Sequence, residues 1–242
     1  MEERKYLTGS LFFYNDKLLY EENGKEKEVK NHNWHRILKD YGWEKLHKQW
    51  IKNLNSYLDR PTNNSLYGSL ECGAGGDCLF HCISYVLNEM YEKEYSASDL
   101  RKDLSESIEE ERYNELIEFY KIFKEVDDFD EDWDPNQMTM ETFKEILIKG
   151  GDEYWGDFLI VNLIKEYINM NLIILNSNEI TEEYYNYPLF YKYEEGLNTI
   201  ILLYEDGHHF KLVGHFQEGN MVTLFNQQTI PHEILKMINY LR

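Results

Sequence analysis

A cysteine stands where a glycine-rich loop runs into a predicted helix. Residues 73–76 read Gly-Ala-Gly-Gly, and Cys78 begins a helical pattern of apolar residues over 78–91. A thiol in the first turn of a helix lies near unpaired backbone N–H groups and the positive end of the helix dipole, and both favour the thiolate. Most cysteines are small buried apolar residues. On the evidence of the loop alone, Cys78 is therefore either a nucleophile or a core residue.

The glycines before Cys78 bear on what such a thiolate would do. Glycine adopts positive φ and lets the backbone approach a bound group closely. The backbone N–H groups of Gly76, Asp77 and Cys78 can then converge on a developing negative charge. We therefore expect a backbone oxyanion hole beside the thiol.

A histidine far along the chain is the second candidate group. The segment Gly207-His208-His209-Phe210 places it at the start of a strand, directly after a hairpin turn. Imidazole is a common general base at neutral pH. A histidine at a turn is more often a surface residue, so this signal gains weight only from its combination with Cys78.

The elements that must position these groups begin with an N-terminal extension. Its predicted elements are hairpin strands 11–14 and 17–20 with a turn at 15–16, a turn at 23–24, a helix over 34–41 capped by Asn33, and a helical stretch over 43–58. The polar segment 60–65 contains Pro61 and ends this region.

Helices and strands alternate in the rest of the chain. The predicted elements are helix 78–91, helical segment 98–126, an acidic loop over 127–134, a helix from Thr139 to the pair Gly150-Gly151, helix 155–167, buried strand 172–175, hairpin strands 198–204 and 210–216, strand 221–225 and helix 231–240. This order predicts a mixed α/β fold of the α+β class.

Composition excludes several classes of protein. The 242 residues carry 25 Lys+Arg against 45 Asp+Glu, a formal net charge of −20, which disfavours nucleic acid as a partner. Hydrophobic residues make up 42%, enough for a globular core. We find no secretory signal and no apolar run long enough for a membrane span.

Three cysteines are too few for a disulfide scaffold and favour a reducing compartment. Cys72, Cys78, His81 and Cys82 are close in sequence, but they lack the paired Cys-x-x-Cys spacing of structural zinc sites. We expect no metal and no other cofactor. An occasional disulfide between Cys72 and Cys78 would need no functional role.

The order of these motifs resembles the ovarian tumour (OTU) family of papain-like cysteine proteases, over residues 66–216. The family's nucleophile lies in Asp-Gly-Asn-Cys-Leu-Phe, which the segment 75–80 matches at Gly76, Cys78, Leu79 and Phe80. The resemblance implies Cys78 as the nucleophile. It also implies a papain-like core in which a small central β-sheet packs between helices.

Two later motifs extend the resemblance. The family's histidine precedes an aromatic residue in a strand, as His209 precedes Phe210, so His209 is the implied general base and His208 a bystander. The family's Trp-Gly helix start resembles Trp155-Gly156-Asp157, which by itself indicates only close packing of the helix on the sheet. Residues Trp155, Gly207 and His208 are expected along the substrate channel.

The sequence departs from the family at two positions. Gly75 stands where the family has Asp, and Lys211 stands where the family commonly has Asp or Asn two residues after the histidine. A lysine ammonium has no acceptor with which to orient the imidazole. Since some family members take the acidic partner from before the cysteine, Glu71 is the candidate orienting acceptor, with an Asn or a backbone carbonyl as alternatives.

The resemblance implies a cysteine-dependent isopeptidase that removes ubiquitin or a ubiquitin-like modifier through a thioester acyl-enzyme. Ubiquitin's tail, Leu-Arg-Leu-Arg-Gly-Gly, carries two arginines that suit an acidic groove, and the segment 98–123 would be the arm that holds the modifier's body. The alternatives are an inactive OTU-like ubiquitin-binding module and a papain-like protease or acyltransferase with another substrate.

The remaining expectations concern organisation and setting. We expect an extension over residues 1–65, a catalytic domain over 66–216, and a C-terminal strand and helix over 217–242 packed on the core. We expect a monomer in the cytoplasm. The richness in Asn, Ile, Tyr, Lys and Glu suggests an AT-rich genome, in which case the setting would be a host cytoplasm entered by a virus or an intracellular bacterium.

Overall fold

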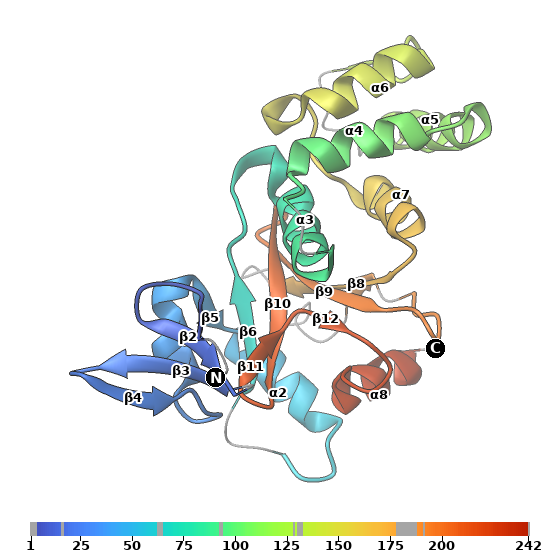
Figure 1. Cartoon of the computed structure of the whole chain (residues 1–242). Coiled ribbons are helices and arrows are strands. Elements are labelled where there is room, and N and C mark those ends of the chain that lie inside the picture. Colours follow the sequence, from blue (N-terminus) through green and yellow to red (C-terminus); the bar gives the residue numbers. More distant parts are fainter. Residues whose placement is uncertain are drawn as a thin grey trace. The chain divides into compact units, whose positions relative to one another are not determined.

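The computed structural model describes residues 4–15, 17–61, 65–91, 94–127, 129, 133–177, 188–190 and 192–241. The chain forms two compact units, the first made of Met1–Glu71 with Asn171–Arg242 and the second of Cys72–Met170 (Figure 1). Eight α-helices and twelve strands lie in the described part, so the fold is mixed α and β, as predicted. None of these helices is long and apolar enough to cross a membrane.

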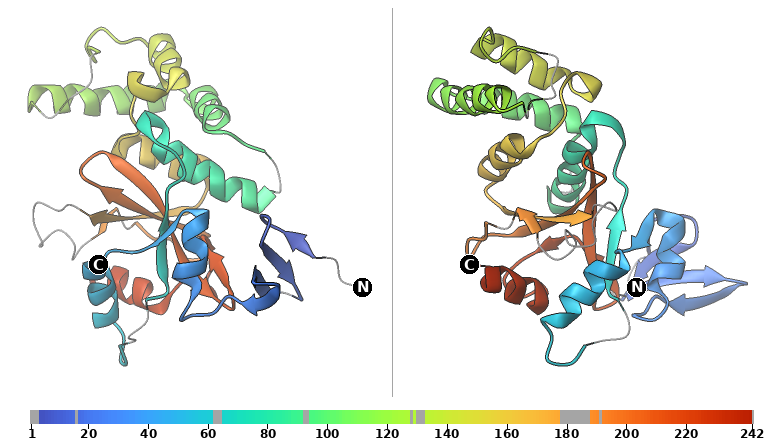
Figure 2. Two further views of the ribbon diagram at one scale, coloured as in Figure 1. Left: turned by 90° about the vertical axis from the view of Figure 1, so that its left-hand side faces the viewer. Right: turned by 180° about the vertical axis from the view of Figure 1, so that it is seen from behind.

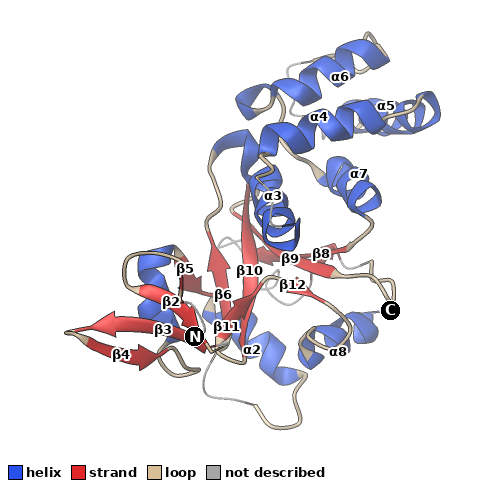
Figure 3. Cartoon of the chain, viewed as in Figure 1, coloured by secondary structure: helices blue, strands red, loops and turns tan. Residues whose placement is uncertain are grey.

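The first unit contains a sheet of eight strands (Figure 3). Its main path runs β5 (Trp43–Lys45), β6 (Tyr67–Leu70), β10 (His209–Gln217), β9 (Thr199–Glu205), β7 (Asn171–Ser177), β8 (Pro188–Phe190). Strands β7 and β9 pair in parallel, while the other neighbours are antiparallel. All seven residues of β7 are buried, which explains why residues 172–175 are a continuous apolar run rather than an alternating pattern.

Strands β9 and β10 form the predicted hairpin, with Glu205 opposite His209. The turn requires positive φ at two successive residues, Asp206 (54°) and Gly207 (79°). Aspartate and glycine tolerate this conformation, and it matches the right-handed twist of the flanking strands. The turn thereby fixes His209 as the first residue of β10.

Two helices pack with the sheet of the first unit around one core. They are α2 (Lys48–Ser56) and α8 (His232–Leu241). Trp50 of α2 is fully buried, and its indole N–H donates to the carbonyl of Asn176 on β7 over 2.7 Å. The core around it includes Leu46, Leu54, Ile173, Leu175, Ile201, Leu203, Val213, Phe225, Ile234, Met237 and Ile238.

A second sheet in this unit comprises β1 (Lys5–Tyr6), β2 (Leu11–Tyr14), β3 (Lys17–Glu22) and β4 (Lys25–Glu28). The predicted hairpin is confirmed with Tyr14 opposite Lys17, although the turn residue Asp16 lies outside the described residues. Asn23 and Gly24 turn the chain with positive φ, as predicted. Strands β1 and β4 were not predicted.

The region that follows differs from the prediction. Helix α1 (Trp34–Ile37) gives way to a 3₁₀ turn (Leu38–Tyr41), and Trp43–Lys45 forms β5 instead of helix. Gly42 at φ 86° ends the turn, and pairing with β6 outweighs the local helical pattern. The side chain of Asn33 does not cap α1, because its Oδ1 accepts the N–H of Lys30.

The second unit is built from helices α3 (Cys78–Tyr91), α4 (Ala97–Ser107), α5 (Glu110–Glu125), α6 (Met140–Lys149) and α7 (Phe158–Ile168). The bounds predicted for α3 are confirmed. The predicted segment 98–126 is two helices, because Ile108 adopts an extended conformation (ψ 113°) and ends α4. Helices α4 and α6 lie side by side, drawn in green and yellow in Figure 2.

Smaller differences concern the end of the chain. The predicted strand 221–225 divides at Thr223 into β11 (Asn220–Val222), which pairs with β10, and β12 (Leu224–Phe225), which pairs with β9. Residues 62–64 of the predicted polar boundary, and 128 and 130–132 of the acidic loop, lie outside the described residues. The domain boundaries at residues 65 and 216 stay predictions.

Candidate functional site

The loop before Cys78 closes in a short 3₁₀ turn, Gly75–Asp77, that leads directly into α3. Gly75 has φ 75°, the conformation predicted from the glycine-rich sequence. The N–H of Cys78 donates to the carbonyl of Gly75. Cys78 itself is the first residue of the helix and is only 2% exposed. Its thiol therefore lies at the positive end of α3, in a desolvated position.

Gly76 has no room for a side chain. A Cβ atom at this position would lie 1.8 Å from the carbonyl oxygen of Gly151, which follows α6. The backbone of the loop is therefore pressed against a second backbone segment. Only glycine allows this approach.

The side chain of Asp77 points toward the protein, where it has two donors. Its Oδ1 accepts the N–H of Gly151 over 3.1 Å and the Nε–H of Arg101 over 2.6 Å. Arg101 lies on α4 and is 1% exposed. Burial lowers the pKa of Arg101, while the charges of Asp77 and Cys78 oppose that shift.

Sequence analysis missed Arg101. A signal was present, since Arg101 occupies a position in the buried stripe of α4, next to Leu100 and three residues before Leu104. A charged residue inside an apolar stripe is rare unless it is paired.

The segment Trp155-Gly156-Asp157 packs against α3. A Cβ on Gly156 would lie 2.7 Å from Leu79, so glycine is required for this contact. Asp157 caps α7 by accepting the N–H of Ile160, and it also accepts the hydroxyl of Tyr120 over 2.7 Å. Burial raises the pKa of Asp157, against the opposing influence of these hydrogen bonds. The cap and the close contact of Gly156 with α3 hold the start of α7 within the second unit.

The imidazole of His209 has a carboxylate partner within the first unit. Its Nε2 lies 2.7 Å from Oε2 of Glu71, the residue that follows β6. Because Leu70 pairs with Leu212 across antiparallel strands, Glu71 is the diagonal neighbour of His209, within reach of a long side chain. The side chains are 20% exposed for His209 and 47% for Glu71.

Lys211 has its own partner. Its Nζ lies 2.6 Å from Oε2 of Glu205. Burial by itself would lower the pKa of Lys211, but the hydrogen bond and the charge of Glu205 outweigh it, so the pKa is raised. The ammonium stays protonated and paired with a carboxylate, which reduces its effect on an imidazolium at position 209.

The other predicted residues are distributed over both units. His208 is exposed, and its Nδ1 lies 2.9 Å from the carbonyl of Asp206. Gly207 is an exposed turn residue, and Trp155 is half-buried in the second unit. Their predicted place along a substrate channel stays a prediction.

The structure brings Glu71 and His209 together in the first unit, and Gly76, Asp77 and Cys78 in the second. The meeting of Cys78 with His209 stays a prediction. The three cysteines, all among the described residues, form no disulfide. Across the residues that the structure covers, no group of three or more His, Cys, Asp or Glu side chains is arranged to hold a metal ion.

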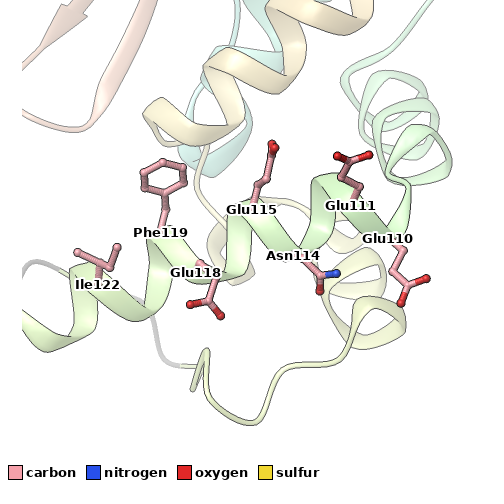
Figure 4. A pocket seen from close by; sticks show the side chains of 7 residues that line it. All are labelled: Glu110, Glu111, Asn114, Glu115, Glu118, Phe119 and Ile122. Carbon is pink, nitrogen blue, oxygen red and sulfur yellow. The ribbon is translucent and has the colours of Figure 1, made fainter.

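The outer face of α5 forms an open hollow (Figure 4). Two apolar side chains, Phe119 and Ile122, are about half exposed there, at 49% and 50%. The acidic and amide side chains of the same face are Glu110, Glu111, Asn114, Glu115 and Glu118. The face combines exposed apolar surface with negative charge.

The chain matches a protein-family model. The family model described as OTU-like cysteine protease matches residues 73–216, more than half of the chain. Curated protein sequences give no match.

Solved structures give distant similarities. An OTU domain in complex with ubiquitin is 17% identical, with a TM-score of 0.40, over 72% of this chain and 81% of that one. An OTU deubiquitinase from Wolbachia pipientis wMel bound to ubiquitin is 14% identical, with a TM-score of 0.42, over 65% and 99%. The viral OTU domain protease from Farallon virus is 12% identical, with a TM-score of 0.41, over 64% and 85%.

Proposed function

Because this chain belongs to the OTU-like cysteine protease family, we propose that it removes ubiquitin or a ubiquitin-like modifier from proteins. The bond cleaved is the isopeptide bond after the modifier's terminal glycine. The family match over residues 73–216, which begins just before Cys78 and includes His209, is the observation that carries this proposal.

In the proposed mechanism Cys78 attacks the scissile carbonyl and His209 transfers the proton to the leaving amine. The position of Cys78 in the first turn of α3 supports its role as nucleophile, because the positive end of the helix favours the thiolate. A thioester forms, and water then releases the modifier's carboxylate. Backbone N–H groups of residues 76–78 are proposed to stabilise the oxyanion in both steps, with that of Asp77 foremost because the N–H of Cys78 donates to the carbonyl of Gly75.

Glu71 is proposed as the group that orients His209. A carboxylate 2.7 Å from Nε2 accepts the ring N–H, fixes the tautomer and stabilises the imidazolium. In the proposed mechanism the other ring nitrogen, Nδ1, then exchanges the proton with the thiol. This arrangement supplies the acceptor that Lys211 cannot provide.

Recognition of the modifier is proposed to involve the outer face of α5. Phe119 and Ile122 offer apolar contact area, and the glutamates around them suit a basic partner. The overall charge of −20 would also attract the two arginines of ubiquitin's tail. A cytoplasmic, monomeric protein remains our expectation.

The departures at Gly75 and Lys211 favour a second candidate, a module that binds ubiquitin without cutting it. Two observations weigh against it. Gly75 adopts the turn that leads into Cys78, and Lys211 is paired with Glu205 while Glu71 lies beside His209.

The first experiment incubates the protein with ubiquitin that carries a C-terminal propargylamide. The proposal predicts a covalent adduct on Cys78, seen as a mass shift and absent in Cys78→Ala, together with hydrolysis of ubiquitin aminomethylcoumarin. Binding without an adduct would favour the inactive module. No binding and no adduct would favour an enzyme for another acyl group.

A further inference from the structure

A buried arginine holds the loop that precedes the proposed nucleophile. The guanidinium of Arg101 donates to Asp77 Oδ1 (2.6 Å) and to the carbonyl of Gly76 (3.0 Å), two successive residues of the loop. It also donates to the carbonyls of Leu147 (3.2 Å) and Tyr154 (3.0 Å), outside the loop. Four acceptors from three separate segments thus converge on one side chain.

We propose that Arg101 is a positioning residue that sets the geometry of the oxyanion hole. The inference rests on the proposed function in one respect only, that Cys78 is an acyl-transfer nucleophile. It goes beyond the family match because it assigns a role to a side chain that lies on a different helix.

Peptide geometry explains how a hydrogen bond from Arg101 to the carbonyl of Gly76 also orients the N–H of Asp77. The C=O of Gly76 and the N–H of Asp77 belong to one planar trans peptide group and point in opposite directions. When Arg101 fixes the carbonyl toward the interior, the N–H is fixed away from it. The hydrogen bond to the carboxylate of Asp77 fixes the same residue a second time.

Gly150 and Gly151 complete this arrangement. A Cβ on Gly150 would lie 2.8 Å from both Arg101 Nε and Asp77 Oδ1, so a side chain there would intrude on the ion pair. Gly151 donates its N–H to the same Asp77 oxygen. The glycine pair that ends α6 therefore also provides the space for the Arg101–Asp77 contact.

The desolvation cost of burying Arg101 indicates that the side chain does more than stabilise the fold. A buried charge costs desolvation free energy, and an apolar residue often serves stability as well or better. The side chain of Arg101 is 1% exposed, and its guanidinium lies 3.7 Å from the centre of the Phe80 ring. An apolar residue could not donate hydrogen bonds to Gly76 and Asp77 and to two other segments at once.

A lysine at position 101 cannot make the hydrogen bonds that Arg101 makes to the loop. It keeps the positive charge, but a single ammonium group cannot reach four acceptors arranged around a planar fork. Arg101→Lys therefore keeps most of the charge effect on Cys78 and removes the grip on the loop. This substitution separates the two contributions.

The test compares two reactions of Cys78. Acylation by p-nitrophenyl acetate forms a tetrahedral oxyanion and releases nitrophenolate as a burst, whereas alkylation by iodoacetamide displaces iodide and forms no oxyanion. We expect Arg101→Lys to slow acylation by roughly tenfold to a hundredfold. Alkylation at neutral pH should change by less than about twofold. For ubiquitin aminomethylcoumarin, the fold decrease in kcat should be larger than the fold increase in KM.

Three variants make the comparison specific. Arg112→Lys is the matched control, because Arg112 lies in the same unit and pairs with Glu115 and Glu166, away from the loop. Leu104→Ala creates a cavity in α4 and shows what loss of stability alone does to both reactions. Cys78→Ala supplies the background for both reagents.

The outcomes are distinct. A slowed acylation with preserved alkylation, seen in Arg101→Lys but not in Leu104→Ala, supports the proposal. Equal effects on both reactions, or no effect on acylation, overturn it. A wild type that shows the ester burst on Cys78 but ignores ubiquitin refutes only the ubiquitin assignment. A wild type with no burst at Cys78 refutes the nucleophile and the role of Arg101 together.

Discussion

The two halves of the proposed catalytic pair are held in different ways. In the second unit, the Cys78 loop is buried, leaves no room for a side chain at Gly76, and is gripped by Arg101. In the first unit, His209 depends on a hairpin turn and on one partly exposed carboxylate, Glu71. The nucleophile's half is fixed by buried contacts, and the base's half by a turn and a partly exposed ion pair.

The chemistry explains this difference. Donors of an oxyanion hole must lie at hydrogen-bond distance from an atom that exists only briefly, so their positions must be set in advance. An imidazole needs only one acceptor to fix its tautomer, and different residues can supply it. Buried polar contacts also cost more to remove than exposed ones, since water cannot replace them. Substitutions in the Cys78 loop should therefore be the more damaging.

The largest combined effect, on turnover and on stability together, is expected from Gly76→Ala. Its Cβ would lie 1.8 Å from the carbonyl oxygen of Gly151, so the loop must move. Turnover of ubiquitin aminomethylcoumarin should fall below about a hundredth of the wild-type rate. The free energy of unfolding should decrease by about 1–3 kcal/mol. Gly9→Ala is the control, because a Cβ there meets no atom within 4 Å. Normal turnover of Gly76→Ala would refute the tight loop.

The base is tested by comparing two neighbouring histidines. His209→Ala should lower kcat/KM by between about 10² and 10⁴. His208→Ala should change it by less than about threefold, because the side chain of His208 is exposed and lies near the carbonyl of Asp206. Steady-state kinetics at neutral pH measures both. Equal losses in the two variants would contradict the assignment of His209.

Acid should weaken the unit that carries the base, because of a second histidine on β10. Burial lowers the pKa of His215 to about 4, from 6.5 for the free side chain. The unfolded chain therefore binds the proton more readily, so stability is highest above pH 6.5 and falls as the pH drops toward 4. The loss should reach about 3 kcal/mol.

Urea unfolding of His215→Phe and of the wild type measures how much stability the titration of His215 removes at low pH. The variant removes the titration and keeps a ring beside Tyr67, whose ring centre lies 4.5 Å from that of His215. Between pH 8 and pH 4 the wild type should lose about 3 kcal/mol more than the variant. Parallel pH profiles would show that His215 titrates normally.

A smaller effect is expected at Glu71. Glu71→Ala removes the acceptor beside His209 and should lower kcat/KM by about tenfold to a hundredfold, less than in a serine enzyme because a thiolate needs less help from its base. Lys211→Asn, which supplies an acceptor at the position common in the family, should recover part of this loss in the double variant. Additive losses in the double variant would argue against an orienting role for Glu71.

The smallest effect is expected on the outer face of α5. Phe119→Ala should raise KM for ubiquitin aminomethylcoumarin about fivefold, equal to ~1 kcal/mol, with kcat unchanged. Tyr240→Ala, at an aromatic residue that is 76% exposed in the first unit, is the control. An unchanged KM in Phe119→Ala would remove α5 from the recognition surface.

Local patterns in the sequence predicted the elements next to the candidate residues. The bounds of α3 follow from a regular apolar stripe, and the turn before His209 follows from Asp206-Gly207, because both are determined by residues close in the chain. Glu71 was singled out on the resemblance, and its partner His209 is 138 residues away. Its role as orienting acceptor stays a prediction.

Long-range contacts account for what was missed. Strand β5 forms because Trp43–Lys45 pairs with β6, which no local pattern indicates. Arg101 finds acceptors on Gly76 and Tyr154, which are 25 and 53 residues away. Backbone carbonyls carry no signature in a sequence, so only the fold shows that they converge on a buried guanidinium.

The central claim, that the imidazole of His209 activates the thiol of Cys78, is tested most directly by the rate of iodoacetamide alkylation of Cys78 as a function of pH. For wild type the account predicts substantial reactivity at neutral pH and two inflections, one for the thiol and one for the imidazole. For His209→Ala it predicts a single rise, at a higher pH than the thiol inflection of the wild type. Superimposable profiles for the two proteins would contradict the claim.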